Sequence, residues 1–143
     1  MQAIHGYYLE DLEVGMSDSF AKTITDADVC LFAGISGDTN PIHINQEYAA
    51  TTQFGQRIVH GMFSAALIST VAGTKLPGPG AIYVDQQLKF RAPVFIGDTA
   101  TASVTVTDID ARRRRIKCRT DVHVGEKLVA TGEATFMVDK REA

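Results

Sequence analysis

The feature that most constrains this chain is an unbroken stretch without a charge, GMFSAALISTVAGT at 61–74. It is apolar nearly all round, and a helix of that kind is buried on most of its faces. The stretch is too short to cross a bilayer, which takes about 20 residues. We therefore expect a helix that runs through the interior of a domain and is ended by the LPGPG sequence at 76–80.

Beyond Gly80 the spacing of apolar residues changes from a helical period to alternation, which predicts strands. Short connections such as VGEK separate these strands, so successive ones are expected to form an antiparallel meander. An earlier strand is expected before the helices. The predicted strands cover residues 18–24, 81–91, 99–108, 115–124 and 127–138.

The first half of the chain is predicted to be helical and rich in loops. Thr25 and Asp28 have the spacing of a capping box, and Gly37 suits a residue just past a helix C-terminus. The QEYAATT sequence predicts one or two further helical turns. Together these elements predict an α+β fold, in which an antiparallel five-stranded sheet wraps around the long buried central helix, the hot-dog arrangement.

Length and composition predict one domain covering 1–143, without repeats or linkers. A formal net charge of −3 and a pI of about 5.7 do not favour nucleic acid as a partner. Cys30 and Cys118 lack any metal-ligand spacing and are expected to be free, buried thiols. The N-terminal residues do not resemble a signal peptide, so we expect a cytoplasmic protein without membrane association. Exposed sheet edges favour a homodimer.

The SGDTNPIHIN sequence at 36–45 holds the strongest candidate pair, Asp38 and His43. Gly37 allows unusual dihedral angles, Pro41 fixes a turn, and Asn40 before it is restricted to extended backbone. Such a loop can direct a carboxylate and an imidazole at one water as a general acid–base pair. The spacing alone slightly favours the alternative, in which Asp38 caps a turn and His43 is a structural histidine.

His60 and Gly61 stand where the charge-free helix is expected to begin. Free backbone N–H groups at a helix N-terminus could stabilise a developing oxyanion, as in a thioester enolate. Alternatively, Gly61 only permits close packing and His60 only caps the helix. Ser64 and Ser69, farther along, are expected to bond the carbonyl one turn back.

Several cations are candidates for binding the phosphates of a substrate. The ARRRR run at 111–115 is either a hairpin turn or an anion-binding patch, and Lys89 and Arg91 are alternatives. No phosphate-binding glycine loop or dinucleotide fingerprint is present. The four histidines lack a metal-ligand spacing, so neither a metal nor a cofactor is expected.

FAGISGDTNPIH followed by INQEYA resembles the hydratase-2 signature of the MaoC-like family. RIVHGMFSAALIS and IYVDQQLKFRAPVFIGDT are similar to the matching segments of (R)-specific enoyl-CoA hydratases, and the resemblance covers roughly 23–138. It implies a hot-dog fold, usually dimeric, and a hydro-lyase. The implied reaction is the reversible addition of water to trans-2-enoyl-CoA, giving (R)-3-hydroxyacyl-CoA.

The resemblance also implies roles for individual residues. Asp38 would be the main base on a water shared with His43, and His43 would pass a proton to the α-carbon. The Gly61 N–H would polarise the thioester carbonyl, while Asn40 and Ser69 would support the site. Coenzyme A would enter only as part of the substrate.

Other readings of the same fold stay open. The protein could be a dehydratase of acyl-carrier-protein-bound or branched acyl thioesters, or a non-catalytic acyl-CoA-binding protein. The acyl length and the pathway, whether fatty acid metabolism, polyhydroxyalkanoate precursor supply or side-chain catabolism, are not given by the sequence.

Overall fold

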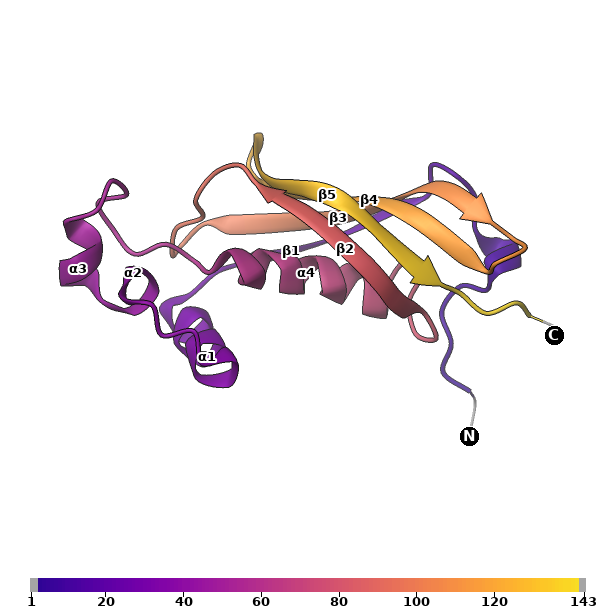
Figure 1. The fold of residues 1–143 in the computed structure, drawn as a ribbon, viewed down its shortest axis with the longest axis horizontal. Coiled ribbons are helices and arrows are strands. Elements are labelled where there is room, and N and C mark those ends of the chain that lie inside the picture. The colour runs from indigo at the N-terminus through magenta and orange to yellow at the C-terminus, as the bar shows by residue number, and fades with distance from the viewer. Residues whose placement is uncertain (1–2, 142–143) are drawn as a thin grey trace.

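A five-stranded antiparallel sheet curves over one long helix in the computed structural model, which describes residues 3–141 (Figure 1). This is the α+β, hot-dog arrangement predicted above. The helices are η1 (Leu9–Asp11), α1 (Asp26–Ser36), α2 (Pro41–Ile44), α3 (Gln46–Ala50) and α4 (Gly61–Thr74). The strands are β1 (Ser17–Thr23), β2 (Ile82–Phe90), β3 (Thr99–Asp110), β4 (Arg115–Val124) and β5 (Lys127–Met137).

The strand order is β1-β3-β4-β5-β2, so only β3, β4 and β5 form a meander. The expectation that all four later strands follow one another in the sheet was wrong, because β2 pairs with β5 at the far edge. The connection at 91–98 is too long for a hairpin turn and crosses the end of the sheet. There the Val94 carbonyl accepts the Val59 N–H at 2.7 Å, which fixes the segment just before α4.

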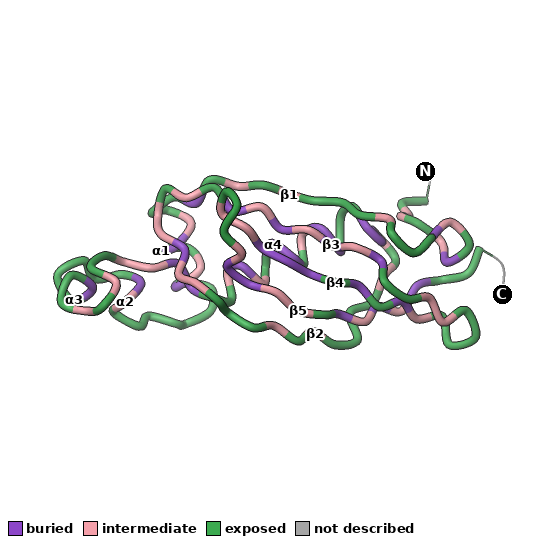
Figure 2. The backbone as a smooth tube through the Cα atoms, turned by 90° about the horizontal axis from the view of Figure 1, so that it is seen from above, coloured by how far each residue is buried: buried purple, intermediate pink, exposed green. Residues whose placement is uncertain are grey.

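One face of α4 packs on the sheet and forms the core. Its buried residues Leu67, Ile68 and Val71 meet inward-facing residues of the central strands such as Val104 and Val122. Figure 2 shows burial concentrated along α4 and the central strands, whereas β1 and β2 at the edges are largely exposed.

The opposite face of α4 is bare in the single chain, although the helix carries no charge. Met62 is 61% exposed on it, and Ala66 and Ser69 are also exposed. Beside this face, Ile82 and Phe90 of β2 are 58% and 53% exposed. The helix is thus covered less completely than its composition predicts, because α4 packs mainly on the β1, β3 and β4 side of the sheet.

The two cysteines are free, as expected, but only one is buried. Cys118 points into the core from β4, and burial raises the pKa of its thiol to about 12. Cys30 is exposed on α1, next to the carboxylate of Asp26. The prediction of a buried Cys30 was wrong because α1 turns only Val29 and Ala33 fully to the core. Within residues 3–141 no helix is both long and apolar enough to cross a membrane.

The arginine run forms the turn of the β3–β4 hairpin, in which Asp110 pairs with Arg115. This turn lies beside the chain termini, at the opposite end of the molecule from α1, α2 and α3 (Figure 1). It is therefore remote from the N-terminus of α4, and within one chain it cannot contact a ligand bound there.

Candidate active site

Helix α1 leads the chain to the catalytic loop predicted from the sequence. Its first turn has the expected capping box: the Asp28 N–H donates to Thr25 Oγ1 at 3.2 Å, and the Thr25 N–H donates to the Asp28 carboxylate at 2.9 Å. Gly37 follows the helix with φ 79°, a left-handed conformation in which a side chain would be strained. The chain therefore leaves α1 sharply, and Asp38 is the first residue of the loop.

Short-range hydrogen bonds hold this loop in shape. The Asp38 N–H donates to Ser36 Oγ at 3.1 Å, and the Asn40 N–H donates to Asp38 Oδ1 at 3.3 Å. Asn40 Oδ1 in turn accepts the Ile42 N–H at 3.1 Å and caps α2, which begins at Pro41. The Asp38 side chain stays exposed, while α2 carries His43 inward.

His43 is buried and held in one tautomer. Its Nδ1–H donates to the Ile58 carbonyl at 2.7 Å; because a carbonyl only accepts, Nε2 carries the free lone pair. Burial lowers the pKa of His43, and neighbouring His60 lowers it further, while the Ile58 carbonyl and the charge of Asp38 oppose the shift. His43 is thus a neutral base near neutral pH.

Arg57 fixes the backbone that carries His43. Its Nε–H donates to the His43 carbonyl at 2.6 Å, and its Nη2 donates to the Asp26 carboxylate at 2.7 Å. The guanidinium holds the pKa of that carboxyl below its ordinary value. Arg57 therefore ties α2 to the start of α1, a link that no sequence pattern indicates.

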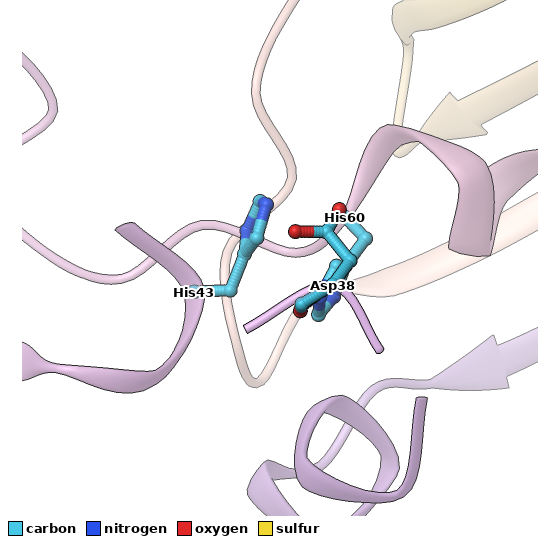
Figure 3. Close-up of side chains that lie close together, drawn as sticks. All are labelled: Asp38, His43 and His60. Atoms are coloured by element: carbon cyan, nitrogen blue, oxygen red, sulfur yellow. Dashed lines mark hydrogen bonds between the residues drawn. The ribbon is translucent and has the colours of Figure 1, made fainter. Parts of the chain in front are cut away.

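His60 is a third member of the site that sequence reasoning missed (Figure 3). It is 1% exposed, its Nε2 lies 2.9 Å from the Asp38 carbonyl, and its ring stacks on His43 with centroids 3.8 Å apart. Figure 3 shows a carboxylate oxygen of Asp38 directed towards His43 beside this stack. His60 occupies the N-cap position of α4, but its ring does not cap the helix. The one sequence feature that could have indicated His60 is its position directly before Gly61.

The first turn of α4 is the only uncapped one among the α-helices at residues 3–141. Thr25, Asn40 and Asn45 cap α1, α2 and α3 with their side chains, whereas α4 has no side-chain cap. No group of the described chain accepts a hydrogen bond from the Gly61 N–H. Because helix N-termini carry partial positive charge, this free donor suits a developing negative charge.

Gly61 lines an apolar cleft of about 370 Å³ between the start of α4 and the ends of β2 and β5. A Cβ at Gly61 would lie 3.1 Å from Phe90 Cε1, so the glycine allows the two to approach closely. Arg91, predicted to bind substrate, lines the same cleft. Lys89 does not reach it, because alternate residues of a strand point to opposite faces and its neighbour Phe90 lines the cleft.

The serines of α4 differ from expectation. Thr70 and Thr74 bond the carbonyl one turn back, but neither Ser64 nor Ser69 makes such a bond in the described structure. Ser64 is buried and lines the cleft. Ser69 is exposed and lies roughly 12 Å along the helix from Gly61, at 1.5 Å per residue, so the single chain does not bring it to Asp38.

Asp38, His43 and His60 each offer one potential ligand atom, and the three atoms lie within 4.8 Å of one another. Partners of one water, at about 2.8 Å each, are roughly 4.6 Å apart. The spacing allows a water to be shared between Asp38 and His43.

We expect the buried, neutral state of His43 to make stability depend on pH. Its folded pKa lies below 6.5, so the unfolded chain takes up the proton first, and stability falls as pH drops below about 6.5. Urea unfolding at pH 7.5 and 5.5 should show a larger loss in the wild-type protein than in His43→Gln. Equal losses of stability in the two proteins would contradict the lowered pKa of His43, since the other titrating groups are common to both proteins.

Comparison with known proteins identifies the family of the chain. Residues 13–128 match the family model described as MaoC like domain. The chain is 57% identical over 135 residues to an (R)-specific enoyl-CoA hydratase of Rhodospirillum rubrum, covering 94% of each chain. It is 50% identical to a 3-hydroxybutyryl-CoA dehydratase of Methylorubrum extorquens, covering 94% of this chain and 86% of that protein.

Solved structures extend the similarity to the fold. An unliganded R-hydratase of Pseudomonas aeruginosa matches with a TM-score of 0.91 at 41% identity, covering 96% of this chain and 89% of that one. The (R)-hydratase of Aeromonas caviae matches with a TM-score of 0.88 at 42% identity, covering 90% and 98%. The chain therefore belongs to the MaoC-like family, and its sheet and central helix are the hot-dog fold of these relatives.

Proposed function

We propose that this protein is an (R)-specific enoyl-CoA hydratase, which reversibly hydrates trans-2-enoyl-CoA to (R)-3-hydroxyacyl-CoA. One observation carries the proposal: the carboxylate of Asp38 and the neutral imidazole of His43 lie close to His60, which directly precedes the free Gly61 N–H at the start of α4. The hydratases and dehydratases among the relatives support the same chemistry.

The residues supply each requirement of the reaction. Water is a poor nucleophile, and Asp38 and the Nε2 of His43 can accept its two hydrogens and leave a lone pair for the β-carbon. As the C–O bond forms, Asp38 takes the proton and the π electrons move to the thioester oxygen. The Gly61 N–H stabilises that charge. The α-carbon of the enolate then receives a proton from the pair of Asp38 and His43, which completes the addition of water.

The tautomer of His43 sharpens this scheme. Its Nδ1–H is committed to the Ile58 carbonyl, so Nε2 has no proton to give until it has received one from the water or from Asp38. His43 can pass a proton to the α-carbon only in that second stage. All the groups come from the chain, so the proposed reaction needs no metal or redox cofactor.

Substrate and assembly follow from the same surfaces. The apolar cleft suits an acyl thioester, and Arg91 at its lining is the proposed contact for the carrier, with Lys89 remaining a sequence prediction.

We propose a homodimer in which a second copy covers the bare face of α4 and the β2 edge, where Met62, Ile82 and Phe90 are more than half exposed.

We expect purified protein to bleach the conjugated absorbance of crotonyl-CoA and to yield the (R)-3-hydroxy product on chiral separation. A series of acyl lengths on coenzyme A and on acyl carrier protein would identify the preferred carrier. The second carrier is tested because the chain is 35% identical to a mitochondrial 3-hydroxyacyl-[acyl-carrier-protein] dehydratase of Solanum lycopersicum. Faster hydrolysis of saturated acyl-CoA than hydration, or binding without turnover, would overturn the proposal.

A further inference from the structure

His60 contacts both members of the proposed acid–base pair but takes no part in the reaction above. We propose that His60 is a positioning residue, which fixes the Asp38 loop and the His43 ring relative to each other through one hydrogen bond and one ring stack. The inference rests on the proposed function, since it assigns a further role within that site.

The hydrogen bond joins the catalytic loop to the central helix. The other hydrogen bonds of Asp38 go to Ser36, the last residue of α1, and to Asn40, and both partners lie within two residues of it in the sequence. His60 Nε2 lies 2.9 Å from the Asp38 carbonyl and must carry the proton, because the carbonyl only accepts. This is the one hydrogen bond, among residues 3–141, that ties Asp38 to a residue more than two positions away in the sequence.

The ring stack orients His43. The two imidazoles lie at 26° with centroids 3.8 Å apart, while the Ile58 carbonyl holds the edge of the His43 ring at Nδ1. Phe32 of α1 contacts His60 in turn, with ring centroids 4.9 Å apart. Since α1, α2 and the start of α4 all contact this one ring, a change there would shift the direction of His43 Nε2 relative to Asp38.

The imidazole of His60 does more than fill space beside His43. His60 Nδ1 is buried and has no hydrogen-bond partner in the described chain. Burying a polar atom without a partner is unfavourable, and an apolar ring would fill this space without that penalty. The imidazole is therefore best explained by its donor nitrogen, which an apolar ring lacks.

Two variants separate the two contacts. His60→Phe keeps an aromatic ring for the stack and removes the donor, whereas His60→Gln keeps an N–H donor and removes the ring. We expect His60→Phe to lower kcat for crotonyl-CoA hydration about 10- to 100-fold with KM within about twofold, as expected for misplaced catalytic groups. His60→Gln should recover part of the loss. The thermal midpoint of His60→Phe should not fall.

The dependence of kcat/KM on pH tests the role of His60 further, because a residue that only filled space would not change it. His60 contributes to lowering the pKa of His43, so the acid limb of kcat/KM should move to higher pH in His60→Phe. Asp38 and Arg57, the charged groups that contact His43 and its backbone, are unchanged in this variant. An unmoved limb together with a wild-type kcat would overturn the inference.

Amide hydrogen exchange separates this inference from the proposed function. We expect residues 36–45 to exchange faster in His60→Phe than in His60→Gln, whether or not the protein hydrates enoyl-CoA. Wild-type protein without hydratase activity would refute only the proposed function. Equal protection of the loop in both variants, or activity lost only in proportion to unfolded protein, would refute the role of His60.

Discussion

Replacing Asp38 with Asn is expected to leave the fold intact and to lower the hydration rate by about 10²-fold or more, the loss expected for a general base. The side chain is exposed, and its one hydrogen bond accepts the Asn40 N–H, which an amide oxygen also accepts. The loop should therefore keep its shape. What the substitution removes is the carboxylate that takes the proton from water.

The measurement is kcat/KM for crotonyl-CoA together with the thermal midpoint. His43→Gln should lose activity to a similar degree, because it removes the other acceptor on the water. Asp108→Asn, which neutralises an exposed carboxylate near the far end of β3, is the matched control and should keep wild-type activity. Near wild-type rates in both Asp38→Asn and His43→Gln would show that the site lies elsewhere.

The elements that sequence alone predicted well are those decided by neighbours along the chain. The capping box of Thr25 and Asp28, the turn at Gly37 and the alternating strand at 99–108 were all predicted from local pattern, and Ala102, Val104 and Val106 of that strand face inward. Each depends on backbone preference or on the alternation of a strand. The loop that carries Asp38 belongs to this class, because the bonds that shape it span only a few residues.

What the sequence could not give depends on contacts between distant segments. Whether β2 pairs with β3 or with β5 is decided by the path of 91–98, and alternation within a strand does not identify its neighbour. His60 lies 22 residues from its partner Asp38 in the sequence. Neither the period of a helix nor that of a strand predicts a contact between residues so far apart. The charge-free composition of α4 also gave no indication that one of its faces is bare in the single chain.

The role of the Gly61 N–H can be tested by a substitution that suits the backbone. Proline is favoured at the first position of a helix, where its missing N–H removes no intrahelical bond. His60 has φ −55° and ψ 134°, the extended conformation that a residue before proline adopts. Gly61→Pro should therefore preserve α4 and remove the proposed oxyanion donor.

Gly61→Ala is the matched control, because both substitutions place a Cβ 3.1 Å from Phe90 Cε1 and only one of them removes the N–H. The contact of the Cβ with Phe90 is then common to both variants, which differ in the N–H and in the two further ring carbons of proline, and the thermal midpoint reports any strain from those carbons. We expect kcat for crotonyl-CoA hydration to be about 10²- to 10³-fold lower in Gly61→Pro than in Gly61→Ala, the loss typical of one oxyanion donor. If the two proteins have similar thermal midpoints and equal kcat, the thioester oxygen is stabilised by another group.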